Sequence, residues 1–232
     1  MRQIAALAAH PLIQKAIGAY NRHIWHILSE DGKYPMFTGI IEAIGEITHA
    51  IPVEGGVSLC IAAGPLDLSD VKKGDSIAVN GTCLTVTSVS GRSIHVDVSR
   101  ETLLCTQGLD QPGGRVKLEK AMRFDDRLGG HLVSGHVDGL GEVITLEPVG
   151  GSCLLAIRAP ATLAKYIARK GSITLNGVSL TVNRIAGKEF EVNLIPHTLE
   201  KTTLRELKPG SKVNLEVDML ARYAERLIAT EG

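Results

Sequence analysis

The sequence contains two copies of one residue pattern, placed 96 residues apart. Residues 80–86 read Asn-Gly-Thr-Cys-Leu-Thr-Val, and residues 176–182 read Asn-Gly-Val-Ser-Leu-Thr-Val. At the same spacing, the pattern of residues 37–42 returns in residues 133–138, while a Val-x-Leu-Glu run returns one residue out of step. A period of this length exceeds the unit of a solenoid. We therefore expect two related small domains, each with its own core, and two related pockets.

Charge and cysteine content exclude several functional classes. The 232 residues carry 25 basic and 25 acidic side chains, with no lysine- or arginine-rich run, so the chain lacks the electrostatic surface of a nucleic-acid binder. The four cysteines form no CxxC pair and have no histidine at metal-ligand spacing, which favours reduced thiols in a cytosol and no metal site. No apolar run approaches the roughly 20 residues of a membrane span.

The first 35 residues lie outside the repeat. Residues 12–28 read as a weakly amphipathic helix and residues 31–35 as a linker. A signal peptide is disfavoured, because the apolar run at residues 4–9 is short and Pro11 follows it closely. We expect Met36 to be the natural start of the chain, which leaves residues 1–35 as an extension that the repeat does not need.

Short alternating segments, such as residues 84–89 and 94–98, are separated by turn signals in both copies. Period-2 alternation at this spacing predicts an all-β barrel or sandwich, and closure into a barrel would remove exposed edges. We expect short helices at residues 163–168 and at the corresponding residues 68–71. A last helix is predicted from Met219 to Ala229, with an apolar face that fits neither barrel and that we expect to pack on another subunit.

The repeated Asn-Gly motif places a turn before a strand. Because side chains alternate along a strand, Cys83 and Thr85 share one face, as do Ser179 and Thr181. Such a row of small hydrogen-bonding groups suits a flat polar heterocycle. The alternative is an ordinary hairpin followed by a half-buried threonine.

The two copies differ at positions that matter for chemistry. His136, which can move protons near neutral pH, corresponds to Ile40, and Cys83 corresponds to Ser179. Glycine at position 135 permits a close backbone approach to a ligand, although a lone histidine is more often structural. The two pockets are therefore not chemically equivalent.

Four motifs, at residues 36–42, 80–86, 129–138 and 195–200, together resemble riboflavin synthase of the alpha-chain type. The resemblance runs from Met36 to the C-terminal helix. It implies two tandem homologous six-stranded Greek-key β-barrels, at residues 36–131 and 132–217, and an oligomerisation helix at residues 218–232 that assembles a homotrimer.

The resemblance also implies a reaction. In this family two molecules of 6,7-dimethyl-8-ribityllumazine react by transfer of a four-carbon unit, giving riboflavin and 5-amino-6-(D-ribitylamino)uracil, the last step of riboflavin biosynthesis. Such an enzyme is a cytoplasmic transferase that uses no metal or cofactor, and its productive site lies between the N-terminal barrel of one subunit and the C-terminal barrel of a neighbour. An association with lumazine synthase is left open.

Position by position, the resemblance implies five residues in the chemistry: Phe37, Ser76, Cys83, His136 and Asp218. We assign His136 to proton transfer, and Ser76 and Cys83 to polarising or positioning groups. Asp218 also sits where it would cap the last helix. The implied first substrate pocket comprises Thr38, Gly39, Ile40, Cys83, Leu84, Thr85, Asp97, Val98, Ser99, Arg100, Glu101 and Thr102. The implied second pocket comprises Gly135, His136, Val137, Lys170, Ser179, Leu180, Thr181, Leu194, Ile195, Pro196, His197, Thr198 and Leu199.

Two alternatives share the sequence features. One is a non-catalytic lumazine- or flavin-binding protein of the same fold, since fold does not decide function. A binder has no need of a proton-transfer group and Cys- or Ser-lined pockets in both halves. The other is a structural β-barrel module without a ligand, which the four ordered motifs disfavour.

Overall fold

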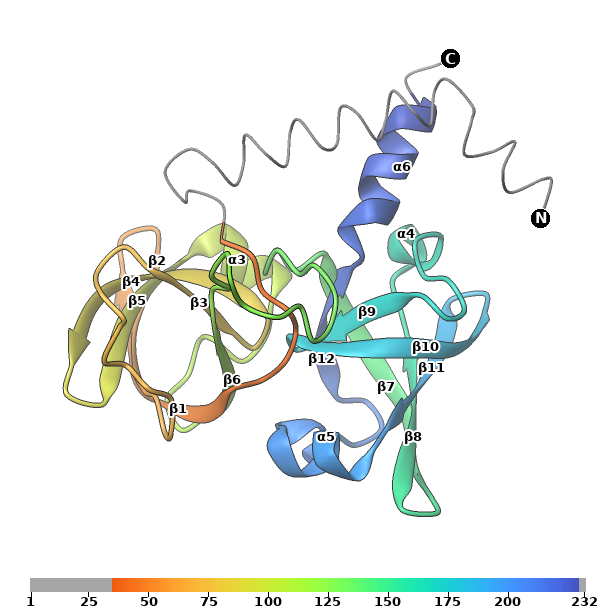
Figure 1. The fold of residues 1–232 in the computed structure, drawn as a ribbon, viewed down its shortest axis with the longest axis horizontal. Coiled ribbons are helices and arrows are strands. Elements are labelled where there is room, and N and C mark those ends of the chain that lie inside the picture. The colour runs from red at the N-terminus through yellow and green to blue at the C-terminus, as the bar shows by residue number, and fades with distance from the viewer. Residues whose placement is uncertain (1–34, 230–232) are drawn as a thin grey trace. The chain divides into compact units, whose positions relative to one another are not determined.

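The computed structural model describes residues 35–229, so the helix predicted at residues 12–28 lies outside the described part (Figure 1). Two closed antiparallel barrels of six strands each are present, as predicted. The first has the order β1-β2-β5-β4-β3-β6, and the second repeats it with β7 to β12. The strands of the first barrel are β1 (Ala43–Val53), β2 (Gly56–Ala62), β3 (Ser76–Val79), β4 (Thr82–Ser90), β5 (Ser93–Ser99) and β6 (Arg115–Lys120). Those of the second are β7 (Gly139–Val149), β8 (Ser152–Arg158), β9 (Ser172–Leu175), β10 (Val178–Ala186), β11 (Glu189–Leu194) and β12 (Lys212–Val217).

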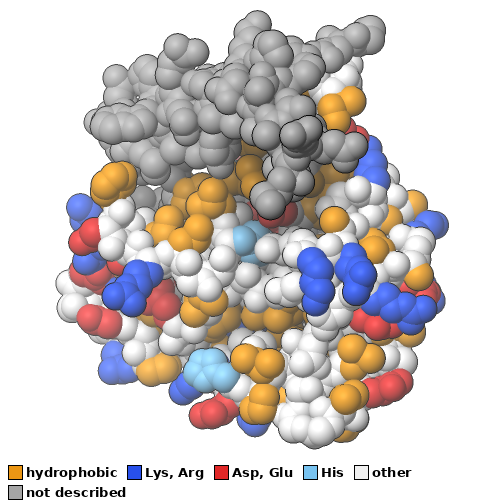
Figure 2. All heavy atoms as spheres, turned by 45° about the vertical axis from the view of Figure 1, so that its right-hand side comes forward, with side chains coloured by type: hydrophobic (Ala, Val, Ile, Leu, Met, Phe, Trp, Pro, Cys, Tyr) orange, Lys and Arg blue, Asp and Glu red, His pale blue; other side chains and the backbone are white. Residues whose placement is uncertain are grey.

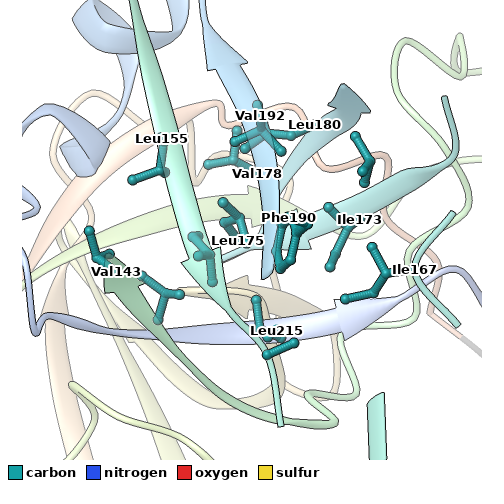
Figure 3. Packing of buried hydrophobic residues seen from close by; sticks show 14 of the residues in the cluster. Val143, Leu155, Ile167, Ile173, Leu175, Val178, Leu180, Phe190, Val192 and Leu215 are labelled. Atoms are coloured by element: carbon teal, nitrogen blue, oxygen red, sulfur yellow. The ribbon is translucent and has the colours of Figure 1, made fainter. Parts of the chain in front are cut away.

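Each barrel encloses its own apolar core, which follows from the alternation in the sequence. In β4, Leu84 and Val86 are buried while Thr85 between them is exposed, and β10 repeats this pattern. Figure 3 shows Phe190, Leu175 and Leu215 converging inside the second barrel. Burial of each such side chain contributes about 1.5–3 kcal/mol to the free energy of folding. Because each barrel has its own cluster of buried apolar side chains, each has its own source of stability.

The short helices differ in part from the prediction. The helix expected at residues 163–168 is instead the single turn α4 (Ala161–Ala164), which starts after Pro160, so the prediction is wrong for residues 165–168. Residues 68–71 form turns, so the helix expected there is wrong. The carboxylate of Asp67 accepts a hydrogen bond from the Ser69 N–H at 2.9 Å, a local bond that competes with a helix.

Three short helical segments were not predicted. α3 (Arg100–Cys105) begins where β5 ends, and the Ser99 hydroxyl accepts a hydrogen bond from the Thr102 N–H at 3.1 Å. In the second barrel, α5 (Pro196–Lys201) follows β11 and is succeeded by the 3-10 helix η1 (Thr203–Glu206). Each is a turn or two long, too short for a periodic apolar signal.

The two Asn-Gly turns pack against each other at the boundary between the barrels. Asn80 and Asn176 both have φ of 49°, and the following glycines have φ of 81° and 83°, as in a type I′ hairpin turn. A Cβ on Gly81 would lie 2.5 Å from the Gly177 nitrogen. The turn predicted for this dipeptide is therefore confirmed, and the two turns also contact each other. Thr85 and Thr181 after the turns are exposed, so the half-buried threonine of the alternative interpretation is wrong.

Equivalent side chains of β6 and β12 make different contacts at this boundary. Asn214 Nδ2 donates to the Asn80 carbonyl at 3.0 Å, and Asn214 Oδ1 accepts from the Gln107 N–H at 2.9 Å. The equivalent of Asn214 in the first copy is Lys117, whose buried Nζ donates to Thr203 Oγ1 at 2.7 Å. Burial lowers the pKa of Lys117 to about 7.

The last helix, α6 (Met219–Ala229), has the predicted bounds. Its polar side faces the second barrel, where Arg222 forms an ion pair with Asp138 at 2.7 Å and Glu225 contacts Lys165 and Tyr166. Its apolar side chains stay exposed, among them Leu220 at 51%, Tyr223 at 59% and Ile228 at 76%.

The face shown in Figure 2 carries no dominant charge. Figure 2 shows acidic and basic side chains interspersed on the face in view. Between residues 35 and 229, no helix has the length and apolar character needed to span a membrane.

Gly81→Ala tests the contact between the turns. Its Cβ would meet the backbone of the second turn, so we expect a loss of about 2–4 kcal/mol in the free energy of unfolding. Gly91→Ala is the matched control, because Gly91 also has a positive φ, 58°, but nothing lies within 4 Å of its added Cβ. Urea unfolding of both variants measures the difference, and equal losses would contradict the contact.

Candidate functional site

In each barrel one strand changes its pairing partner, and the predicted binding residues lie at that point. Residues 82–85 of β4 pair with β3, and the pairing of β4 with β5 begins only at Val86 and Val96. Residues 97–99 of β5 pair with β2. The segments 83–85 and 97–99, both predicted to bind substrate, therefore lie on strands that separate from each other here.

The second barrel repeats this separation. Residues 178–181 of β10 pair with β9, while the pairing with β11 begins at Val182 and Val192. Asn193 and Leu194 of β11 pair with β8. The predicted segments 179–181 and 194–199 thus take the same two positions as their counterparts in the first barrel.

Where β4 and β5 are not paired, peptide groups of β4 point into the gap between the two strands. Ser76 O accepts from the Ala121 N–H at 3.1 Å, so the backbone of Ser76 bonds toward β6. Its β4 neighbour Thr85 is then in a non-hydrogen-bonded pair, and the peptide groups of Thr85 point away from β3. Peptide donors and acceptors so placed can recognise the edge of a flat polar ring.

Not every predicted binding side chain faces outward. Leu84, Val98, Leu180 and Leu194 are buried in the barrel cores, so they can offer a ligand only their backbone. Thr85, Thr181 and Asp97 are exposed, and Cys83 and Ser179 are half-buried. The exposed loop residue Lys170 has a φ of 68°.

Two short segments, which we name the crossing segments, connect the barrels reciprocally: residues 37–39 and residues 133–135. They pair with each other, since Phe37 N–H donates to Val133 O at 2.8 Å and Val133 N–H donates to Phe37 O at 3.0 Å. Beyond that bridge they diverge. Gly39 O accepts from the Ser179 N–H and Gly135 O accepts from the Cys83 N–H, both at 2.8 Å.

A buried carboxylate anchors each crossing segment. Glu119 accepts hydrogen bonds from Thr38 N at 2.6 Å, Thr38 Oγ1 at 2.7 Å and Gly39 N at 3.0 Å. Glu216 accepts from Ser134 N at 2.7 Å, Ser134 Oγ at 2.6 Å and Gly135 N at 3.0 Å. Burial raises the pKa of Glu119 to about 7 and raises that of Glu216, and the bonds from the crossing segments oppose the increase.

Sequence reasoning assigned no role to these two glutamates. The signal was present, because both end the repeated Val-x-Leu-Glu run. The run indicates the repeat, but nothing local in the sequence shows that its glutamate is buried or what the carboxylate binds.

The glycines of the crossing segments approach the protein itself. Gly39 and Gly135 both have a φ of 75°. A Cβ on Gly135 would lie 2.7 Å from the Cβ of Cys83, and one on Gly39 would lie 2.6 Å from the Cβ of Ser179. The close approach expected of Gly135 is thus made to the opposite barrel, which explains why only glycine fits.

Ser76 and Cys83 are brought together on β3 and β4. The Ser76 hydroxyl hydrogen-bonds to the Cys83 thiol and lowers its pKa, but burial raises that pKa more and the Glu216 carboxylate adds to the increase. The thiol therefore stays protonated at neutral pH, which fits a polarising group better than a nucleophile.

The other predicted catalytic residues occupy different environments. Phe37 is fully buried between the barrels with Ala78 and Val133, so its ring positions the crossing segment. His136 is exposed, as is its counterpart Ile40. Asp218 Oδ1 accepts from the Leu220 N–H at 3.0 Å, which is a cap of α6; a catalytic role for Asp218 stays a prediction.

His131 was missed by the sequence analysis, although it lies in one of the four motifs. Its Nδ1 lies 2.7 Å from Ser179 Oγ. Burial lowers the pKa of His131, and the nearby Asp218 carboxylate opposes this.

The described residues contain no group of three or more His, Cys, Asp or Glu side chains that could hold a metal ion. A surface hollow of about 420 Å³ is lined by residues that include Leu66, Asp67 and Arg92, and none of the predicted site residues lines it.

The repeat corresponds to a known domain. The family model described as lumazine binding domain matches residues 38–121 and again residues 134–218.

Several relatives that match most of the chain are riboflavin synthases. A riboflavin synthase of Photobacterium phosphoreum is 48% identical over 197 residues, which cover 84% of this chain and 90% of that protein. The riboflavin synthase of Mycobacterium tuberculosis (strain ATCC 25618 / H37Rv) is 46% identical over 202 residues, covering 85% of this chain and 100% of the relative. The Bacillus subtilis (strain 168) enzyme is 42% identical over 194 residues, or 83% and 90% of the two chains.

Solved structures of LumP share the architecture. The LumP complex with riboflavin has a TM-score of 0.72 at 27% identity, covering 78% of this chain and 99% of LumP. The complex with 6,7-dimethyl-8-(1′-D-ribityl)lumazine has a TM-score of 0.70 at 26% identity, with the same coverage.

Proposed function

The chain belongs to the lumazine-binding family of riboflavin synthases, and we propose that it catalyses the dismutation of 6,7-dimethyl-8-ribityllumazine. One substrate molecule donates a four-carbon unit to a second, giving riboflavin and 5-amino-6-(D-ribitylamino)uracil. The enzyme is then a transferase that needs neither metal nor cofactor.

The observation that carries this proposal is the pair of related but unequal sites. Two molecules of one substrate need two similar pockets, and both barrels separate their strands at the same place. Donor and acceptor must react differently, and the pockets differ at Cys83 and Ser179 and at Ile40 and His136. A duplicated site with such differences fits a reaction between identical molecules.

The proposed chemistry requires removal of a proton from an acidic methyl group and then attack of the carbanion on the second ring. We assign the proton transfer to His136, which is exposed and able to reach a ligand at the barrel surface. The protonated Cys83 thiol and the Ser76 hydroxyl would polarise the bound ring. Most of the acceleration would come from holding two reactants in register, an effect of about 7–11 kcal/mol.

We further propose that the productive site lies between two subunits of a homotrimer. The exposed apolar side chains of α6, among them Leu220, Tyr223 and Ile228, support a subunit contact along this helix. The cytoplasmic location and the association with lumazine synthase stay predictions.

Incubation of the purified protein with 6,7-dimethyl-8-ribityllumazine tests the proposed reaction. We expect the substrate to disappear and riboflavin to form at half the molar amount, measured by chromatography with fluorescence detection. Binding without riboflavin formation would instead identify a carrier, and no binding would identify a structural module.

His136→Ala tests the proton-transfer assignment. We expect kcat to fall by about 100-fold, since a general base typically contributes 10²- to 10⁴-fold, while substrate affinity changes little. His49→Ala is the control, because His49 is exposed on β1 and its Nδ1 contacts only its neighbour Thr48 among the contacts described. Equal losses in kcat and affinity would show that His136 positions substrate instead.

Deletion of residues 219–232 tests the role of α6. We expect the trimer to dissociate and activity to be lost, as measured by light scattering and riboflavin formation. The double variant Tyr223→Glu with Ile228→Glu is a second test, since it keeps the Arg222–Asp138 pair that fixes the helix to its barrel. A fully active monomer from either variant would refute the shared site.

A further inference from the structure

We propose that Arg222 of α6 is a positioning residue for His136, so that the helix assigned to subunit contact also fixes the group assigned to proton transfer. This inference rests on the proposed function, because it concerns the residue that moves the proton in that reaction. The role assigned to Arg222 is to hold the backbone of His136, without contact to the reacting atoms.

A single nitrogen of Arg222 makes two contacts with the second barrel. Its Nη2 donates to the His136 carbonyl oxygen at 3.1 Å and to Asp138 Oδ2 at 2.7 Å. A terminal guanidinium nitrogen carries two protons, so it can serve both acceptors at once. The side chains of Arg222 and Asp138 are 32% and 17% exposed, and solvent screens such a partly buried pair less than an exposed one. The guanidinium group therefore holds the carbonyl of residue 136 and the carboxylate of residue 138 together.

His136 lies in a two-residue link between two fixed points of the chain. Before it, Gly135 O accepts from the Cys83 N–H at 2.8 Å, and after it, the Asp138 N–H donates to Leu215 O at 2.8 Å. The exposed His136 ring forms no hydrogen bond with another residue between 35 and 229. The direction of this ring therefore depends on its backbone, and the bond from the helix to the carbonyl is a polar contact that fixes that backbone.

The guanidinium group reaches this position with one donor unused. Arg222 Nε is buried and has no hydrogen-bond partner in the described part of the chain. A buried donor without a partner lowers stability, so an arginine that only fastened the helix would be better placed where Nε is also satisfied. The observed geometry instead satisfies His136 O and Asp138.

The first copy has the same carboxylate position but lacks the arginine. Glu42 lies 96 residues before Asp138, and its Oε1 accepts from the Lys120 N–H at 2.7 Å, as Asp138 Oδ2 accepts from the Val217 N–H at 2.8 Å. Within residues 35–229, no lysine or arginine side chain pairs with Glu42. The arginine contact therefore accompanies the histidine and is missing from the copy that has Ile40 in its place.

Arg222 and Tyr223 are adjacent in α6 but face different partners. Arg222 points to Asp138 of its own barrel, whereas Tyr223 is exposed together with other apolar side chains of the helix. A subunit packed against these apolar side chains would hold α6 on its barrel and keep Arg222 on the His136 carbonyl. Assembly and the position of the proton-transfer group are thus linked through one side chain.

The charge of Arg222 also reaches the crossing segment, so a test must separate the two effects. Burial raises the pKa of Glu216, while hydrogen bonds from Ser134 and the charge of Arg222 oppose the increase. Loss of that charge would therefore affect the carboxylate that anchors residues 133–135. Such an effect does not require His136, and this difference can be measured.

A double-mutant cycle of Arg222→Gln and His136→Ala tests the inference. We expect Arg222→Gln to lower kcat for 6,7-dimethyl-8-ribityllumazine about tenfold, because a displaced proton-transfer group loses part of its contribution, while KM changes little. In the His136→Ala background the same change is expected to have little further effect. An action through Glu216 or through folding would give independent losses in both backgrounds.

Two further variants complete the test. Arg222→Lys is the conservative change, and we expect it to restore most of kcat, because one ammonium nitrogen can donate to both acceptors. Glu225→Gln is the matched control, since Glu225 fastens the same helix to Lys165 and Tyr166 but contacts neither His136 nor Asp138. We expect its kcat to equal that of the wild type. Light scattering and thermal melting show whether each variant is assembled and folded.

If Arg222→Gln fails to fold, Asp138→Asn takes its place in the cycle, because it removes the ion pair while its amide oxygen can still accept from the Val217 N–H.

The outcomes distinguish this inference from the proposed function. A wild type that converts lumazine, with an unchanged kcat in Arg222→Gln or equal losses in both backgrounds, overturns the inference and leaves the function standing. Dissociation of the Arg222→Gln assembly also overturns it, because the loss then comes from the subunit contact. A wild type that does not convert lumazine overturns both.

Discussion

Each barrel receives a backbone carbonyl from the segment that leads into the other barrel. Gly135 O accepts from the Cys83 N–H and Gly39 O accepts from the Ser179 N–H, both at 2.8 Å. The buried carboxylates of Glu119 and Glu216 each accept three hydrogen bonds from one of these segments. Removing one partner would leave a buried carboxylate without its donors, so the arrangement of the two barrels depends on this exchange.

The same exchange explains how two similar domains become two different pockets. Duplication preserved the backbone, including the strand separation and the glycines with positive φ. The differences lie in single side chains set on that common frame, Cys83 with Ser76 in one pocket and Ser179 with His131 in the other. A rigid frame with altered side chains allows identical substrate molecules to be treated unequally.

Much of the fold was predictable from local patterns. Alternation in β4 and β10 places Leu84 and Leu180 inward and Thr85 and Thr181 outward, as the structure shows. The bounds of α6 were predicted because its apolar spacing extends over three turns. The helix expected at residues 68–71 failed, because the side chain of Asp67 forms a turn that apolar spacing does not reveal.

The sequence by itself determined the duplication, the strand periodicity, the family and the positions at which the two copies differ. Only the tertiary structure decided which groups meet across the repeat, such as His131 with Ser179, Thr38 with Glu119 and the two Asn-Gly turns with each other. The physical reason is distance along the chain. Local propensity and periodicity act over a few residues, whereas these contacts join residues 48 to 96 positions apart and form only when both barrels have closed.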